Sequence, residues 1–306
     1  MAKLIYPYSN IRPCMTFRCN FNCSYCGVKH YQENLCGING YIKEELPIGV
    51  WIKRLNEIEP LRSDFTVILG NTELAIYKDF HRAANEIKWN TKIYTNASTL
   101  SMKELRKVKN RDNLHFYISY HSEFIDCDEF TSNAVELQSK FNIINFHAVP
   151  TPAIRGRLLD DKKKMAESGL NLVIEHPYLV TKPGNYNFYD EIGEMPKFKN
   201  RFSVRCGDAI EKTVFCKTSV NHSRFCNTMS YPVAPNGDIY TCWRYILAKS
   251  KDGILGNFFD EDFQYHDNYY ECSHYGDCNA CAWDKNIIDK KTGKQLDTDV
   301  IKWEHL

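Results

Sequence analysis

The sequence predicts an α/β fold, in which a partial (β/α)6 TIM-like barrel is followed by a small cysteine-rich β-hairpin module. Short runs rich in β-branched and aromatic residues alternate with segments whose apolar residues recur at helical spacing. Such alternation is typical of βαβ units, whose right-handed crossovers bring the carboxyl ends of the strands to one rim. Barrels build their sites on that rim, so side chains that directly follow the strands are candidates for function.

The strands and helices of the barrel are expected within residues 1–180. Strands are expected near residues 12–16, 65–69, 92–95, 114–119, 143–149 and 170–175. Helices with apolar and polar faces are expected at 48–58, 79–88, 101–109, 128–140 and 160–168. Residues 181–225 are rich in Pro, Gly, Asn and aromatic residues, which indicates an irregular connection. Residues 226–306 form the small module, with strands around Asn236-Gly237, a dipeptide that favours a tight hairpin.

Composition argues against some classes of partner. The formal net charge is +1 and 43% of the residues are hydrophobic, so no strong overall charge suggests nucleic acid as a partner. The first residues lack the charged start and apolar run of a signal peptide, and no stretch of about 18 apolar residues occurs. We therefore expect a cytoplasmic protein with no membrane partner.

Cysteine usage points to metal chemistry. The chain has 13 cysteines, an odd number that excludes a complete internal disulfide set. Disulfides are disfavoured in a reducing cytosol, where cysteine-rich chains more often use their thiolates for metal binding or catalysis. The cysteines gather near the two ends of the sequence, so two separate sites are expected.

The first site is the segment RCNFNCSYCG, in which Cys19, Cys23 and Cys26 follow the first predicted strand with C-x3-C-x2-C spacing. Three thiolates so close together can hold a four-iron cluster and leave one iron without a protein ligand. Zinc is the alternative, since Cys23 and Cys26 form a C-x2-C pair that His30 could complete. The position at the rim of a barrel favours the iron cluster. Cys14 and Cys36 also have a simpler interpretation as small buried hydrophobes.

This segment resembles the cluster-binding loop of the radical S-adenosylmethionine (SAM) superfamily, including the aromatic Tyr25 before the third cysteine. The resemblance extends to the ends of later strands. The segment LGNTELAIYKDF is similar to the Gly-Gly-Glu segment of the family, with Asn71 and Thr72 in place of the glycines and Glu73 as the glutamate. The segment YTNAS resembles the family's Thr-Asn-Gly and contains Asn96.

After the fourth strand, ISYHS offers Ser119 and His121 on the same rim, and these two residues and Asn96 are candidate SAM contacts. The resemblance implies that SAM chelates the open iron and that one electron cleaves its sulfonium to a 5′-deoxyadenosyl radical, which takes a hydrogen atom from the substrate. It also implies that the Glu73 segment engages the methionyl ammonium, that Tyr25 lies near the adenine, and that Ser119 reaches the methionyl carboxylate or ribose. The alternative for Glu73, Asn96 and Ser119 is local capping or turn bonding, and His121 could equally be a core histidine.

The second site is the C-terminal cysteine set. Cys226 and Cys242 flank the predicted hairpin, with Gly237 five residues before Cys242, and Cys278 and Cys281 form a C-x2-C pair. This order resembles the SPASM and twitch extensions found behind many radical SAM barrels, and its short ending fits the twitch form. The resemblance implies one auxiliary four-iron cluster on these four cysteines. A four-cysteine zinc site is the alternative.

Three cysteines remain near this set. Cys272 is a reserve ligand for the auxiliary cluster, because it lies between the hairpin and the C-x2-C pair. Cys206 and Cys216 lie in the irregular connection, where an exposed thiol could return a hydrogen atom to a substrate radical, as in some related enzymes. Simple packing is the more common fate of a cysteine.

The resemblance leaves the substrate open, because one radical generator serves many chemistries. Families with such an extension include peptide maturases, sulfatase-maturing enzymes, and oxidases or epimerases of aminocyclitols and sugars. We therefore expect a peptide or a sugar- or aminocyclitol-like small molecule as substrate, an outcome of oxidation, epimerisation or cross-linking, and a flavodoxin- or ferredoxin-type reductant as partner. The alternatives are a radical SAM enzyme that modifies nucleic acid or nucleotides, and a non-catalytic iron–sulfur or zinc protein.

Overall fold

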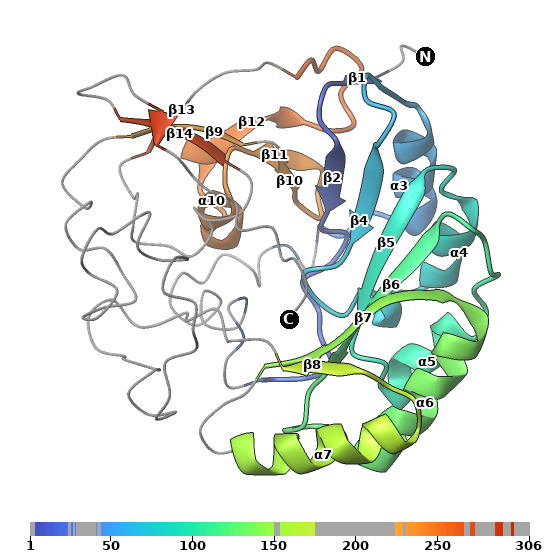
Figure 1. Ribbon diagram of the computed structural model, residues 1–306. Coiled ribbons are helices and arrows are strands. Elements are labelled where there is room, and N and C mark those ends of the chain that lie inside the picture. Colours follow the sequence, from blue (N-terminus) through green and yellow to red (C-terminus); the bar gives the residue numbers. More distant parts are fainter. Residues whose placement is uncertain are drawn as a thin grey trace. The chain divides into compact units, whose positions relative to one another are not determined.

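The computed structural model describes residues 4–23, 26, 28, 41, 44–149, 154–174, 224–228, 231–265, 270–272, 285–289 and 295–296. These residues form a mixed α/β fold with a largely parallel sheet (Figure 1), which confirms the predicted fold class at that level. The chain divides into two compact units. The first unit comprises Met1–Pro177 and Ser230–Tyr265, and the second comprises Tyr178–Met229 and His266–Leu306.

The first unit is built on a nine-stranded sheet with the order β12-β11-β10-β2-β4-β5-β6-β7-β8. The strands from β10 to β8 pair in parallel with their neighbours in this order. Six of them match the strands predicted from the sequence: β2 (Asn10–Pro13), β4 (Thr66–Leu69), β5 (Asn90–Thr95), β6 (Leu114–Tyr120), β7 (Asn142–Ala148) and β8 (Leu172–Ile174).

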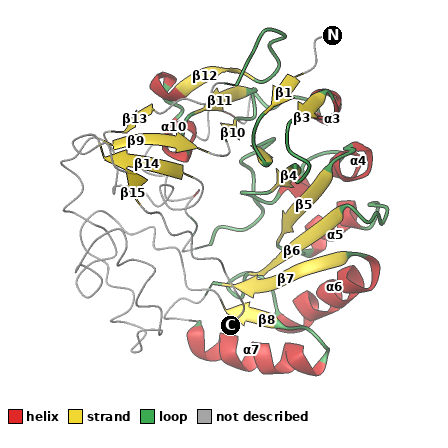
Figure 2. Cartoon of the chain, turned by 45° about the horizontal axis from the view of Figure 1, so that its top comes forward, coloured by secondary structure: helices red, strands yellow, loops and turns green. Residues whose placement is uncertain are grey.

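Helices cover one face of this sheet (Figures 1 and 2), as right-handed crossovers between parallel strands require. They match the five predicted helices: α3 (Ile48–Asn56), α4 (Phe80–Glu86), α5 (Thr99–Leu105), α6 (Cys127–Lys140) and α7 (Arg155–Glu167). Helix α6 shows why they form. Asp126 caps its first turn by accepting from the backbone of Asp128, and Phe130, Ala134 and Leu137 recur at helical spacing and are buried.

The two faces of the parallel strands differ in chemistry. In β6, Leu114, Phe116, Ile118 and Tyr120 are buried on the helix side, whereas the alternate residues His115, Tyr117 and Ser119 are only partly buried. Side chains of a strand point alternately to opposite faces, so the polar members share the face away from the helices. That face and the carboxyl ends of the strands are where the candidate site lies.

Residues 231–257 add an antiparallel extension to this sheet, although the sequence analysis grouped them with the C-terminal module. It consists of β10 (Pro232–Val233), β11 (Asp238–Tyr240), α10 (Trp243–Ala248), η4 (Lys251–Gly253) and β12 (Ile254–Asn257). Strands β10 and β11 form a hairpin, with Gly237 at φ 90° in its turn. Strand β10 pairs with β2, where Pro232 lies opposite Arg12, so the hairpin's hydrogen bonds run to the parallel sheet. The three-part division of the chain stays a prediction.

Two short strands had no signal in the sequence. β1 (Leu4–Tyr6) and β3 (Ile58–Pro60) pair in parallel as a separate two-stranded sheet. Each has three residues, too few for an alternating pattern to be recognised. Tyr6 and Ile58 are nevertheless buried, so these strands belong to the core of the first unit.

The second unit contains a four-stranded antiparallel sheet with the order β13-β9-β14-β15. Its strands are β9 (Arg224–Thr228), β13 (Tyr270–Cys272), β14 (Lys285–Asp289) and β15 (Gln295–Leu296). Of the irregular connection predicted over residues 181–225, residues 181–223 lie outside the described residues, and Arg224 and Phe225 belong to strand β9, which corrects the prediction there. Among the described helices of the whole chain, none has the length and apolar character needed to cross a membrane.

Candidate functional site

The three-cysteine loop, residues 19–26, begins shortly after β2. The backbone N–H of Cys26 donates to the carbonyl of Cys23 at 3.1 Å, so the two cysteines of this C-x2-C pair are linked through their backbones. The Cys19 sulfur accepts a hydrogen bond from the backbone N–H of Phe21 at 3.5 Å. The three loop cysteines differ in burial: Cys23 is buried, Cys26 is half-buried and Cys19 is exposed.

Asn20 fastens this loop to the end of β5. Its side-chain carbonyl accepts from Asn96 Nδ2 at 2.9 Å, and its own amide donates to Ser98 Oγ at 2.9 Å. Asn96 is 3% exposed, and its carbonyl oxygen also accepts from the backbone of Ser98. Asn20 was not predicted, although its position between Cys19 and Cys23 was a signal.

Glu73 connects the carboxyl ends of β4 and β5. It follows β4 and is buried, and its carboxylate accepts from Thr95 Oγ1 at 2.8 Å and from the backbone N–H of Asn96. Burial raises the pKa of Glu73 to about 7, against the opposing effect of the hydrogen bonds from Asn96 and Thr95. Although Cys19 as a whole residue is exposed, desolvation of its sulfur raises its pKa; the hydrogen bond from Phe21 opposes this effect and the nearby charge of Glu73 adds to it.

Asn71 and Thr72 stand where the resembling family has glycines. Asn71 has φ 84°, in the left-handed region that glycine adopts freely and asparagine tolerates better than most residues. Its amide donates to Cys14 Sγ at 3.3 Å, and Thr72 Oγ1 donates to the carbonyl of Thr16 at 2.9 Å. The asparagine therefore keeps a glycine-like turn, and both side chains bind this loop to the segment just after β2.

Ser119 forms a pair with His147, a residue that sequence reasoning missed. Ser119 Oγ lies 2.7 Å from His147 Nε2, because the two residues are register partners on β6 and β7. A register shift between Phe116 and Tyr117 creates this pairing, since it turns His147 rather than Phe146 to the face of Ser119. Burial lowers the pKa of His147 to about 4, so its imidazole is neutral near pH 7.

His147 has capacity to bind a further group. Its Nδ1 is buried and has no hydrogen-bond partner among the residues that the structure describes. Buried polar atoms are nearly always satisfied in native structures, so an unsatisfied one beside a site suggests a position for a ligand. The signal in the sequence was a histidine near the carboxyl end of a predicted strand.

His121 lies against the cysteine loop. Its Nδ1 is 3.2 Å from Cys23 Sγ, and its ring packs edge-on against Phe21 with centroids 5.6 Å apart. Burial, followed by the charge of His147, lowers the pKa of His121 to about 4. Of the predicted rim residues, Glu73, Asn96 and His121 thus lie at the cysteine loop, whereas Ser119 is bonded to His147.

The three loop thiols are candidate ligands for an iron–sulfur cluster or for zinc. Within the described ranges, no three His, Cys, Asp or Glu side chains are placed to hold one metal ion. A four-iron cluster takes each thiolate on a different iron, so its sulfur ligands need not converge on one point. Three thiols in one short loop therefore fit such a cluster. His30, which the zinc alternative requires, and Tyr25 lie outside the described residues.

The auxiliary cysteines are only partly described. Cys242 follows β11 and is buried, and its carbonyl accepts from the backbone N–H of Ile246 at 3.3 Å. Cys226 lies within β9, where its backbone stands opposite Tyr270 of β13 and Ile287 of β14, and Cys272 ends β13. Cys206, Cys216, Cys278 and Cys281 lie outside the described residues.

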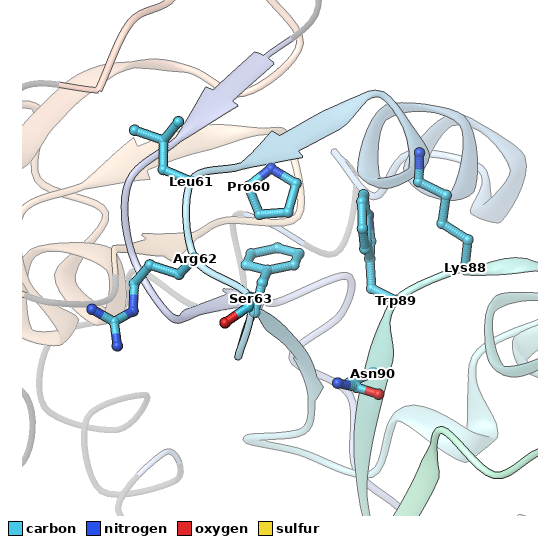
Figure 3. Close-up of a pocket in the computed structure, with 8 residues that line it drawn as sticks. Pro60, Leu61, Arg62, Ser63, Lys88, Trp89 and Asn90 are labelled. Carbon is cyan, nitrogen blue, oxygen red and sulfur yellow. The ribbon is translucent and has the colours of Figure 1, made fainter.

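A pocket of about 360 Å³ lies at the opposite ends of the strands (Figure 3). Leu61 and Arg62, which precede β4, and Lys88 and Trp89, which precede β5, contribute to its lining. The cysteine loop, Glu73 and Asn96 all follow the carboxyl ends of strands. This pocket is therefore not part of the candidate site.

Several solved structures resemble the chain, all with low sequence identity. Hexahistidine-tagged anSMEcpe with bound AdoMet aligns with a TM-score of 0.48 and 17% identity, over 84% of this chain and 76% of that chain. Streptococcus suis SuiB bound to S-adenosylmethionine gives 0.41 and 15%, over 84% of this chain and 62% of SuiB. SuiB bound to precursor peptide SuiA gives 0.40 and 15%, over 85% and 64%.

The chain thus spans less than two thirds of SuiB. No protein-family model and no curated protein matches it. With TM-scores below 0.5, these likenesses assign no activity to the chain.

Proposed function

We propose that this chain is a radical SAM enzyme, in which Cys19, Cys23 and Cys26 hold a four-iron cluster at the rim of a partial barrel. One observation carries the proposal. Asn96 bonds both to Asn20 of the cysteine loop and to the carboxylate of Glu73, so three segments that follow three strands meet at one place. A structural loop could hold its cysteines without recruiting a buried carboxylate from a neighbouring strand end.

The protein's own residues have definable roles in this reaction. When bound, the cluster supplies the electron that cleaves the SAM sulfonium and yields the 5′-deoxyadenosyl radical. Glu73 would accept the methionyl ammonium, because its carboxylate lies at the end of β5 and close to Cys19 of the cysteine loop. Ser119, which is hydrogen-bonded to His147, would bind the methionyl carboxylate or ribose, and Tyr25 would lie near the adenine.

The proposal includes an auxiliary four-iron cluster on Cys226, Cys242, Cys278 and Cys281, the cysteines of the twitch-like sequence pattern. Its support is the spacing of these cysteines around the hairpin turn at Gly237. The substrate class is a peptide or a sugar- or aminocyclitol-like small molecule, which loses a hydrogen atom and is oxidised, epimerised or cross-linked. A flavodoxin- or ferredoxin-type protein would deliver the electron.

The central test is SAM cleavage. Anaerobically reconstituted protein, given reductant and SAM, should form 5′-deoxyadenosine, and replacing Cys19, Cys23 and Cys26 by Ala should abolish it. Cys127→Ala is the matched control, because this buried cysteine lies on α6 outside the loop. Cleavage that survives the triple replacement would refute the proposal.

The role of Glu73 has its own test. Glu73→Gln keeps one acceptor oxygen but removes the charge, so SAM should bind roughly tenfold more weakly or worse. SAM titration of the reduced cluster's EPR spectrum measures this. If the spectrum of the unsubstituted protein does not respond to SAM at all, a non-catalytic electron carrier becomes the better interpretation.

Metal analysis tests the auxiliary cluster separately. Two four-iron clusters predict about eight irons per chain. About four irons together with one zinc would mean that the C-terminal cysteines form a structural zinc site. That result would remove the auxiliary cluster while leaving the radical SAM assignment in place.

A further inference from the structure

The His121 imidazole meets the sulfur of Cys23, the most buried of the three loop cysteines, with Nδ1 and Sγ 3.2 Å apart. We propose that His121 donates this Nδ1–H to the Cys23 thiolate, and thereby positions that ligand and raises the reduction potential of the cluster. The inference rests on the proposed function, because it requires a cluster on the loop. It gives His121 a role at the protein ligand, whereas the sequence analysis made it a SAM contact.

Both the backbone and the ring of His121 are held in place. The His121 carbonyl accepts from the backbone N–H groups of Phe124 and Ile125 at 2.9 and 3.1 Å, which fixes the turn after β6. Phe21 packs edge-on against the imidazole and stacks on Phe124 with ring centroids 5.3 Å apart. Since Phe21 belongs to the same loop as Cys23, these contacts fix the sulfur and the imidazole relative to each other.

The direction of the hydrogen bond follows from the ligand's charge. A cysteine bound to iron is a thiolate with no proton, so its sulfur can only accept. His121 must then be the donor, with its proton on Nδ1. A hydrogen bond to a cluster sulfur stabilises negative charge, and the reduced cluster has one more electron than the oxidised one. The bond therefore favours reduction.

Two substitutions separate the hydrogen bond from the bulk of the side chain. Asn places an amide donor close to the position of Nδ1, whereas Leu fills the space without a donor. We expect the midpoint potential of the SAM-responsive cluster to shift negative in His121→Leu and to stay near the unsubstituted value in His121→Asn. His81→Leu is the control, because that histidine pairs with Glu104 between α4 and α5 and should leave the potential unchanged.

A second measurement does not depend on the potential or on activity. In protein labelled with ¹⁵N-histidine, pulsed EPR of the reduced SAM-responsive cluster should detect a nitrogen coupling that disappears in both His121→Leu and His121→Asn. If His121→Leu fails to assemble a cluster, the loss of the nitrogen coupling in His121→Asn is enough to show that His121 contacts the cluster.

Two results would overturn the inference alone. One is an unchanged potential in His121→Leu with its iron content intact, and the other is an equal shift in both variants without a histidine coupling in the unsubstituted protein. The absence of any SAM-responsive cluster in the unsubstituted protein would instead overturn the proposed function and this inference together.

Discussion

Asn96 is the residue on which the arrangement of the candidate site depends. It is buried, and it bonds through its side chain to Asn20 and Ser98 and through its backbone to Glu73. Asn96→Ala removes the side-chain bonds to Asn20 and Ser98 but keeps the backbone bond to Glu73, and the lost bonds should lower the free energy of unfolding by about 1–3 kcal/mol. Urea denaturation of the apo protein measures the loss.

The matched control is Asn142→Ala, since Asn142 is exposed at the start of β7. Its unfolding free energy should stay within about 0.5 kcal/mol of the unsubstituted value. If both variants lose the same stability, the connection through Asn96 is not what holds the cysteine loop.

Individual site residues differed in how far the sequence could predict them. Glu73 and Asn96 were identifiable because each lies within four residues of the end of a predicted strand, in a segment that resembles a motif of the radical SAM superfamily. His147 was not, because its pairing with Ser119 depends on a register shift between β6 and β7. The bond between His121 and Cys23 joins residues 98 positions apart, and no local pattern encodes such a contact.

At the scale of elements, the hairpin β10–β11 depends on one glycine. Gly237 has φ 90°, and a Cβ there would lie 2.4 Å from Phe259 and 2.7 Å from Asn257 Oδ1. Gly237→Ala should therefore cost roughly 1–3 kcal/mol, because backbone strain adds to the clash. Thermal or urea unfolding measures the effect.

Gly156→Ala gives the opposite expectation for the same chemical change. Gly156 lies in α7 with open space around its Cα, so alanine should stabilise the helix by about 0.5 kcal/mol. The unfolding free energies of the two variants test this difference. If Gly237→Ala loses no more stability than Gly156→Ala, the turn tolerates a side chain.

Helices α5 and α6 are connected by a charge cluster that depends on pH. Glu136 of α6 accepts from Arg106, the residue after α5, at 2.9 Å and from Lys140 at 2.8 Å. These bonds lower the pKa of Glu136 to about 2, below its value in the unfolded chain. Their contribution is therefore present above about pH 5 and is lost as the pH falls towards about 2.

Glu136→Gln should remove that contribution, which for a surface network is about 0.5–1 kcal/mol. We expect the difference in unfolding free energy from the unsubstituted protein to be largest near neutral pH and to shrink on acidification. Urea titrations at several pH values measure it. A difference that grows as the pH falls has the wrong sign and would contradict this assignment.

Most elements of the first unit followed from local periodicity. The six strands of the parallel sheet and the five helices were predicted because each has enough residues to show its period. The pairing of β10 with β2 was not, since it joins residues 220 positions apart, Pro232 and Arg12. Such pairing is a property of the assembled sheet, and the hairpin sequence gives no sign of it.

At the scale of the whole molecule, the cysteines differ in burial, so their reactivity can locate the cluster. Cys19 is exposed, whereas Cys14 and Cys127 are buried. Alkylation of an accessible cysteine is faster than that of a buried one. In the apo protein, we expect Cys19 to react well ahead of Cys14 and Cys127, as measured by peptide mass spectrometry.

Anaerobic reconstitution with iron and sulfide should slow the alkylation of Cys19 at least tenfold, because a thiolate bound to iron is no longer a free nucleophile. Cys14 and Cys127 should stay slow in both states, and they serve as internal controls for folding. If only cysteines from Cys226 onwards become protected while Cys19 reacts as before, iron is bound only in the C-terminal part of the chain. The chain would then lack the cluster that radical generation from SAM requires.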